Sequence, residues 1–421
     1  MQRRNFLKTS ASAALLAGTL PSCAVPPAQE EKFYGHQGRI MDYQKFSIID
    51  PGLKIKKIET WSKPNVAVVR VTADNGMEGW GQISTYDADI SALVLHRKIA
   101  SLVLGSDPAD IDDLADRCVE RNLKFPWSYV LRALGGVETA IWDLYGKIRE
   151  QPVCELLGGE VKPVPIYGSS MSRAIKPEDE VERFTRLRDE IGINAFKFRI
   201  SKEASRNGDA WPGRTEEIIK AVGSELADSC TLLVDANSGY TPDRAIEVGK
   251  MLRADGRHRH SEPCPYWEIE WTAEVTRSLD LKVSGGEQDN DLSQWRRIIS
   301  LPSVDIIQPD PLYLGGVVRT VRAARMAAGK GIPCVPHSAN LCMVTVFALH
   351  IMRAIPNAGP YLEYTIEEGG INQIARELYS PKLEITDGNL DMPSAPGWGV
   401  EFNKGWLDKA DYQVSGEDIP G

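Results

Sequence analysis

Polar side chains follow a series of short apolar segments in the second half of the chain, and they recur at nearly constant spacing. The segment TLLVDAN is typical, because Leu232, Leu233 and Val234 run directly into Asp235 and Asn237. Subtracting residue numbers gives spacings of 27, 25, 23, 27 and 26 positions along the series Asp235, Glu262, Glu287, Asp310, His337 and Glu363. Each spacing is about the length of one strand and one helix, so the polar residues recur in phase with a repeated strand–helix unit.

The alternation of strand and helix patterns begins at about residue 163. Strands are expected at PVPIYGSS, NAFKFRIS, TLLVDAN, HRHSEP, DLKVSGGE, VDIIQPD, IPCVPHS and GPYLEY. Amphipathic segments such as RTEEIIKAVGSEL lie between them, as expected of helices that cover a parallel sheet. A doubly wound open sheet is the alternative, but no Gly-rich dinucleotide turn accompanies these strands. We therefore predict an α/β chain with a (β/α)8 TIM barrel over residues 161–390.

Residues 46–160 form a different pattern, which predicts a separate α+β domain. IKKIETWS and NVAVVRVTA read as strands, and Asn75-Gly76 is typical of a tight turn between strands. A long helix is expected at VETAIWDLYGKI, because its apolar residues fall on one helical face. That face consists of Val137, Ala140, Ile141, Leu144 and Ile148.

The first 23 residues predict an export signal rather than a part of the fold. Arg3 and Arg4 precede an apolar run over residues 11–20, which is too short to span a bilayer as a lasting anchor. The paired arginines resemble a twin-arginine (Tat) signal, and the segment LPSC resembles a lipoprotein cleavage site. We therefore expect an exported, periplasmic protein, either free or anchored by a lipid on Cys23, with a linker over residues 24–45.

The charge pattern argues against a nucleic-acid partner. The formal net charge is −9, and Lys and Arg form no basic stripe that would bind phosphates without sequence preference. No second apolar stretch reaches the length needed to span a membrane.

The strand ends predict a metal site. In a (β/α)8 barrel the carboxyl ends of all the strands meet at one mouth. Asp235, Glu262 and Glu287 would then lie on three adjacent strands and repel one another strongly unless a cation lay between them. Ligation by oxygen alone suits Mg²⁺, with Mn²⁺ as the alternative.

The later strand ends predict an acid–base group. His337 follows the strand next to the one that ends at Asp310, and a carboxylate beside a histidine fixes its tautomer and raises its basicity. A histidine can remove a proton next to a carboxylate only if the resulting negative charge is neutralised. The predicted metal would neutralise it, together with donors such as Lys197 or a protonated Glu363.

These segments together resemble one known family. VETAIWDLYGKIREQPVCELLGG, KFR, VDAN, SEP, GGE, QPD, VPHS and YLEY occur in the order typical of the enolase superfamily, mandelate racemase subgroup. The resemblance covers residues 54–402 and implies an α+β N-terminal capping domain over a modified (β/α)8 barrel. It also implies that the closing segment, residues 391–421 with SAPGWGVEFN, returns to the capping domain.

The resemblance implies roles for the site residues. Mg²⁺ would bind Asp235, Glu262 and Glu287, and the His337–Asp310 pair would be the base. Glu363 would hydrogen-bond the enolised carboxylate of a small-molecule substrate, and Asn237 would be a further substrate-binding residue. Residues 80–89, including Tyr86, and residues 37–43 would close over the substrate. The family's habit also implies a homo-oligomer.

One departure from the family pattern bears on the reaction. The second strand often carries Lys-x-Lys, whereas this chain has Lys197-Phe198-Arg199. Arginine stays protonated and grips carboxylates well, so Arg199 is a poor second base. This favours a one-base dehydration of an aldonic or aldaric acid to a 2-keto-3-deoxy acid. The alternatives are a racemase, epimerase or cycloisomerase that uses Lys197 against His337, and a non-catalytic carboxylate-binding protein of the cell envelope.

Overall fold

The structure is a computed structural model that describes residues 52–202, 206–254 and 258–416. The predicted export signal, Cys23, the linker and the substrate loop at 37–43 lie outside the described residues, so these predictions stay predictions. Within the described ranges, no helix has both the length and the apolar character needed to cross a membrane.

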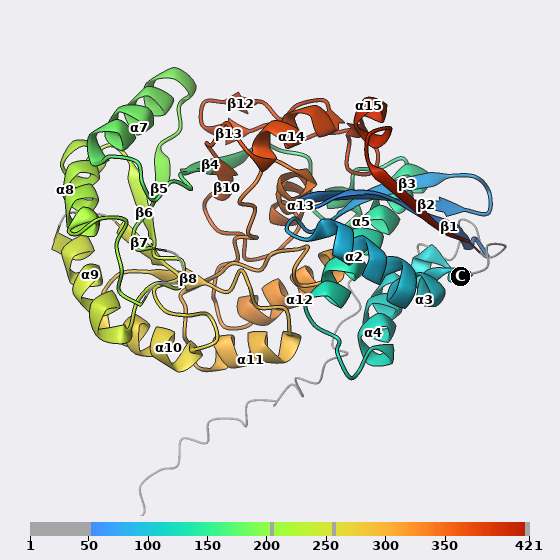
Figure 1. The fold of residues 1–421 in the computed structure, drawn as a ribbon, viewed down its shortest axis with the longest axis horizontal. Helices are drawn as coiled ribbons and strands as arrows, with labels where there is room; N and C mark the ends of the chain where they lie inside the picture. The colour runs from blue at the N-terminus through green and yellow to red at the C-terminus, as the bar shows by residue number, and fades with distance from the viewer. Residues whose placement is uncertain (1–51, 203–205, 255–257, 417–421) are drawn as a thin grey trace, which may run out of the picture. The chain divides into compact units, whose positions relative to one another are not determined.

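An antiparallel sheet opens the described chain, with the strand order β15-β1-β2-β3 (Figure 1). Its strands are β1 (Ile55–Lys63), β2 (Val66–Ala73), β3 (Glu78–Ile83) and β15 (Asp411–Gly416). The predicted turn at Asn75-Gly76 joins β2 to β3: Gly76 has φ +86°, which glycine adopts readily, and Ala73 N donates to Met77 O at 2.9 Å.

Helix α5 (Tyr129–Arg149) packs against this sheet. Four members of the predicted apolar face, Val137, Ala140, Ile141 and Leu144, are fully buried. A Cβ added at Gly79 of β3 would lie 2.1 Å from Ala140 O, so glycine is what lets the strand approach the helix this closely. The remaining helices of this region are α2 (Ala88–Val94), the π-helix η1 (Leu95–Ile99), α3 (Ala100–Val103), the 3-10 helix η2 (Pro108–Asp110), α4 (Ile111–Arg121) and α6 (Val153–Leu156).

The C-terminal segment returns to the capping domain, as the resemblance implied. Strand β15 pairs with β1, with Tyr412 opposite Trp61. The buried Trp398 donates its Nε1 proton to Thr139 O at 2.8 Å. Asp143 of α5 accepts from the backbone N–H groups of Trp80 at 2.8 Å and Trp398 at 2.9 Å, which ties β3 and the C-terminal segment to one helix.

A parallel barrel follows, and β10 pairs with β4 to close it. Its strands are β4 (Val164–Ser169), β5 (Ala195–Arg199), β6 (Thr231–Asp235), β7 (His258–Ser261), β8 (Val283–Gly285), β9 (Ile306–Ile307) and β10 (Leu362–Thr365). The predicted seventh strand, IPCVPHS, is reduced to single bridges from Cys334 to Ile307 and to Ala358. Prolines on both sides of this short segment remove the N–H groups that a longer ladder needs.

Helices alternate with the barrel strands (Figure 1). They are α7 (Pro177–Ile191), α8 (Arg214–Leu226), α9 (Pro242–Ala254), α10 (Ile269–Ser278), α11 (Leu292–Ser300), α12 (Val317–Ala328) and α13 (Met343–Met352). The C-terminal part adds α14 (Ile371–Leu378), β11 (Tyr379–Ser380), β12 (Ile385–Thr386), β13 (Asn389–Leu390), β14 (Glu401–Phe402) and α15 (Lys404–Leu407).

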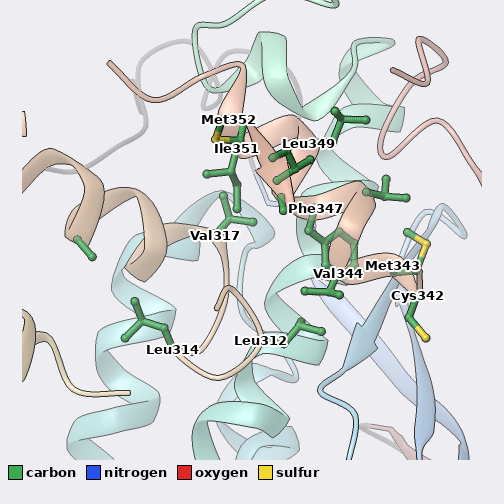
Figure 2. Packing of buried hydrophobic residues seen from close by; sticks show 14 of the residues in the cluster. Leu312, Leu314, Val317, Cys342, Met343, Val344, Phe347, Leu349, Ile351 and Met352 are labelled. Atoms are coloured by element: carbon green, nitrogen blue, oxygen red, sulfur yellow. The ribbon is translucent and has the colours of Figure 1, made fainter. Parts of the chain in front are cut away.

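The main core continues from the capping domain into the barrel. Leu312 and Leu314, from the connection between β9 and α12, and Val317, the first residue of α12, belong to the same buried cluster as Val344 and Phe347 of α13 (Figure 2). Asp310 lies in this connection, so the core fixes the backbone next to a predicted site residue.

Candidate active site

The structure brings the predicted strand-end residues together at the carboxyl ends of the barrel strands. In the parallel register Arg199 of β5 lies opposite Asp235 of β6, and Asp235 lies opposite Ser261, which directly precedes Glu262. All of the predicted residues in this set are buried, although each is polar or charged: Lys197, Arg199, Asp235, Asn237, Glu262, Glu287, Asp310, His337 and Glu363. Burying so many ionisable groups is costly unless they neutralise one another, which predicts a tightly paired site.

Asp235 is the carboxylate that the neighbouring cations neutralise. Its Oδ2 lies 2.6 Å from Arg199 Nη1 and 3.0 Å from Lys197 Nζ. Burial would raise the pKa of Asp235, but Arg199 and then Lys197 overcome it and hold the pKa below its usual range. Asp235 is therefore ionised.

Glu262 is the carboxylate with the least compensation. Burial, followed by the charges of Glu287 and Asp235, raises its pKa well above the usual value. Its Oε2 accepts from Asn237 Nδ2 at 3.1 Å, whereas its buried Oε1 has no hydrogen-bond partner. The three predicted ligands thus lie close enough to repel one another, and one of them keeps an unused oxygen.

This donor set has the oxygen ligands that a hard divalent cation prefers, and Arg199 contacts one of them. Among the described residues, no three His, Cys, Asp or Glu side chains already surround a common point as metal ligands. Arg199 Nη1 lies 2.6 Å from Asp235 Oδ2, and Gln288 Nε2 donates to Glu287 Oε1 at 3.0 Å, so two of the three carboxylates already have protein partners. The oxygen-only chemistry and the unpartnered Glu262 Oε1 suit Mg²⁺, but Asp235 would have to exchange its contact with Arg199.

His337 and Asp310 form the predicted pair. His337 Nδ1 lies 2.7 Å from Asp310 Oδ2, which places a proton on Nδ1 and leaves Nε2 directed at the carboxylates of Glu287 (3.3 Å) and Glu363 (3.8 Å). Burial opposes a charge on the ring, but Glu287, then Asp310 and Glu363, raise the pKa of His337 to about 10. A cation that offset the charge of Glu287 would lower this pKa toward the range of a useful base.

Lys197 and Glu363 form a buried ion pair, with 2.6 Å between Nζ and Oε1. Burial opposes ionisation of both groups, but Lys197 and then His337 lower the pKa of Glu363 to about 2, and the charge of Glu363 raises the pKa of Lys197. Of the two donors that the sequence analysis considers, Lys197 and a protonated Glu363, this contact favours Lys197, because the ammonium group stabilises the ionised form of Glu363. Lys197 is the donor of this pair.

A pocket of about 460 Å³ opens beside these groups. Five of the predicted site residues contribute to its wall, namely Tyr86, Arg199, Asn237, Glu287 and His337. Tyr86 lies in an exposed position, with φ 62°, and its carbonyl accepts from Arg132 Nη1 at 3.2 Å. The pocket therefore lies between the capping domain and the mouth of the barrel.

Sequence reasoning missed several residues of the pocket wall: Arg132, Met171, Arg173, Gln288, Tyr313, Asn340, Glu367 and Asn372. Arg173 follows the first barrel strand and donates to Asn237 Oδ1 at 2.7 Å, so the strand-end rule extended to that strand would have found it. Arg132 comes from α5 of the capping domain, and its guanidinium group lies over the ring of Tyr313, 4.6 Å from the ring centroid. No signal in the sequence marks that contact.

An α+β capping domain over a closed barrel, with paired carboxylates and a histidine at the strand ends, is the arrangement of the enolase superfamily. The chain belongs to the mandelate racemase/muconate lactonizing enzyme family. Residues 49–158 match the N-terminal domain model of that family, and residues 179–406 match the model described as enolase C-terminal domain-like.

Curated relatives of the chain are enzymes. It is 25% identical over 348 residues to an arabinonate dehydratase of Saccharolobus solfataricus, with 81% of this chain and 89% of the relative covered. It is 26% identical over 359 residues to a D-galactarolactone cycloisomerase of Agrobacterium fabrum, with 80% and 89% covered. The chain is therefore an enzyme of the enolase superfamily, of the lyase or isomerase class. The alternative of a non-catalytic carboxylate-binding protein is not supported.

Solved structures agree with the fold. A Roseobacter denitrificans protein described provisionally as a racemase is 53% identical, with a TM-score of 0.84 over 86% of this chain and 100% of that one. A mandelate racemase/muconate lactonizing protein of Paracoccus denitrificans, complexed with magnesium, is 28% identical, with a TM-score of 0.78 over 86% of this chain and 99% of that one. Magnesium is thus found with a member of this family.

Proposed function

We propose that the protein dehydrates an acid sugar, an aldonic or aldaric acid, to a 2-keto-3-deoxy acid. The observation that carries the proposal is the contact between His337 Nδ1 and Asp310. It leaves His337 Nε2 directed at the carboxylates of Glu287 and Glu363. Arg199 stays protonated against Asp235, so it cannot serve as a second base. The names of several curated relatives as sugar-acid dehydratases support the same class of reaction.

His337 removes the proton next to the substrate carboxylate through Nε2, while Asp310 holds the Nδ1 proton and keeps the ring oriented. Lys197 and Arg199 offer positive charge to the enediolate oxygens. The imidazolium ion of His337 then returns its proton to the departing hydroxyl group on the neighbouring carbon, and the enol product tautomerises to the keto acid. When bound by Asp235, Glu262 and Glu287, Mg²⁺ would neutralise part of the enediolate charge and lower the pKa of His337.

The pocket supports a polyhydroxylated substrate. Its wall carries Arg173, Asn237 and Gln288, whose side chains can exchange hydrogen bonds with hydroxyl groups, and Tyr86 at the rim from the capping domain. A substrate held by these groups would present its carboxylate to Arg199, which lines the same pocket. We place the enzyme in the periplasm by its twin-arginine-type N-terminus, which the described residues do not include.

The test is a screen of the purified protein against aldonic and aldaric acids with Mg²⁺, with detection of 2-keto acids. We expect turnover of at least one acid sugar and its loss in His337→Asn. Lack of turnover across a broad panel, or full activity in His337→Asn, would refute the proposal. Glu182→Gln, on the outer helix α7, is the matched control and should keep full activity.

An isomerisation is the second candidate. Lys197 Nζ and His337 Nε2 approach the same Glu363 carboxylate, at 2.6 Å from Oε1 and 3.8 Å from Oε2. Two proton-carrying groups on either side of a substrate carbon are what a racemase, epimerase or cycloisomerase needs, and one relative is named as a cycloisomerase. Solvent deuterium at the α-carbon without loss of water would favour this candidate over dehydration.

A further inference from the structure

Helix α5 of the capping domain contacts the connection between β9 and α12 and also the start of α12. Within the connection, a Cβ added at Gly135 would lie 3.3 Å from Leu312 O, so the helix backbone and the connection are in close contact. At the start of α12, Glu138 accepts from the backbone N–H groups of Val317 and Val318, each at 2.8 Å. The capping domain therefore holds a barrel connection by its main chain.

Glu138 is tied to this position by its surroundings. It is fully buried and also accepts from Trp142 Nε1 at 3.0 Å. Val317 and Val318 are the first residues of α12, where backbone N–H groups have no partner within the helix and the helix dipole favours a negative charge. A Cβ at Gly316 would lie 2.2 Å from Glu138 Oε2, so the residue before the helix leaves room for the carboxylate.

The connection next to Glu138 contains Asp310. Asp310 Oδ1 accepts from the N–H groups of Leu312 at 2.7 Å and Tyr313 at 3.0 Å, and Gly316 N donates to Pro311 O at 2.7 Å. These bonds make residues 310–316 one compact turn, and the buried Leu312 and Leu314 fix its packing (Figure 2). The other oxygen of Asp310 contacts His337 Nδ1, so a shift of this turn would move the carboxylate relative to the ring.

We propose that Glu138 is a positioning residue, which holds the start of α12 so that Asp310 stays on His337 Nδ1. By this route the capping domain sets the geometry of the acid–base pair, although Glu138 touches neither residue. An effect of Glu138 on catalysis rests on the proposed function, because that function takes His337 as the base. The effect of Glu138 on the contact between Asp310 and His337 does not, since this contact can be measured in the free protein.

The experiment follows the His337 ring by NMR in protein labelled with ¹⁵N-histidine, without substrate. In the parent protein the hydrogen-bonded Nδ1 proton of His337 should give a strongly downfield signal, identified by its loss in His337→Asn. In Glu138→Gln an amide group faces N–H donors, so we expect this signal to move upfield or disappear. Hydrogen exchange at Val317 and Val318 should become at least about tenfold faster.

Asp143→Asn is the matched control, because Asp143 is a buried carboxylate of the same helix that binds Trp80 and Trp398 and not α12. We expect the His337 signal to stay unchanged in this variant. A signal unchanged in Glu138→Gln would overturn the proposal. So would an equal displacement in Asp143→Asn, since the effect would then be a general loosening of the capping domain.

A milder variant keeps the proposal testable if Glu138→Gln does not fold. Trp142→Phe removes one of the three donors to Glu138 and keeps most of the buried volume. It should move the His337 signal in the same direction by a smaller amount, and an unchanged signal would again overturn the proposal. Because no substrate is involved, a failed acid-sugar screen would leave this result unaffected.

Discussion

Lys197 Nζ and Glu363 Oε1 lie 2.6 Å apart, fully buried, and their strands β5 and β10 flank β4 on either side. The pair exists only because the barrel closes, since 166 positions separate the two residues in the chain. It fixes the charge state of the site, with an ionised Glu363 and a protonated Lys197.

Removal of Lys197 should destabilise the protein strongly. Lys197→Met leaves Glu363 buried without its main cation, and breaking a buried pair in this way costs about 3–5 kcal/mol in the free energy of unfolding. The double variant Lys197→Met/Glu363→Gln should be more stable than Lys197→Met alone, because no charge is then left unpaired at Glu363. Urea unfolding of the parent, of Lys197→Met, of Glu363→Gln and of the double variant measures this, and costs that simply add would contradict the pairing.

Addition of Mg²⁺ should stabilise the protein through the carboxylates. At a hundredfold excess over Kd a ligand specific for the folded state adds about 2.7 kcal/mol, so the Tm should rise with MgCl₂ and fall back with a chelator. Glu262→Gln should remove this response. Without Mg²⁺, the same variant should unfold at a higher temperature than the parent, because it relieves the repulsion from Glu287 and Asp235.

The control for that measurement is NaCl at equal ionic strength, which should leave the Tm of both proteins nearly unchanged. A rise in Tm with MgCl₂ that is equal in the parent and in Glu262→Gln would contradict a site at these carboxylates.

Acidification should destabilise the protein partly through His350. Burial lowers the pKa of His350 to about 3, and its Nδ1 accepts from Cys154 N at 3.1 Å, so the folded state holds it neutral. The unfolded chain takes up the proton at the ordinary pKa of about 6.5. This contribution is therefore fully present above pH 6.5 and is lost as the pH falls toward 3.

His350→Asn isolates the effect, since an asparagine oxygen can accept from Cys154 N and cannot be protonated. Between pH 6.5 and 4 the free energy of unfolding of the parent should fall more steeply than that of the variant, by a difference on the order of 1 kcal/mol per pH unit, and its Tm should fall more steeply as well. Thermal unfolding across this range measures it. Parallel curves would show that His350 does not couple to folding.

The barrel and its strand-end residues could be predicted from the sequence because the fold repeats. In a (β/α)8 barrel, a carboxylate that directly follows a buried strand lies at the mouth of the barrel. The nearly constant spacing of Asp235, Glu262 and Glu287 therefore predicts that the three side chains lie close together. The capping helix α5 was predictable for the same reason, since its apolar residues share one face.

The rest of the site depends on contacts that no local pattern encodes. Arg132 and Tyr86 reach the pocket only because the capping domain lies against the barrel. The ionised state of Glu363 follows from its distance to Lys197, which barrel closure sets. Nothing in the sequence distinguishes Glu138 from other residues of its helix. Its buried contact with the start of α12 follows from the packing of the capping domain on the barrel.

The most direct test of the central claim, that His337 removes the α-proton and water then leaves, is turnover of an acid sugar in D₂O with mass and NMR analysis of the product. We predict a keto acid that has lost one water and carries deuterium at C3, where the enol takes up solvent hydrogen, and we predict no product from His337→Asn. Deuterium at C2 of recovered or epimerised sugar acid with no keto acid formed, or product formed by His337→Asn at the parent's rate, would contradict the account.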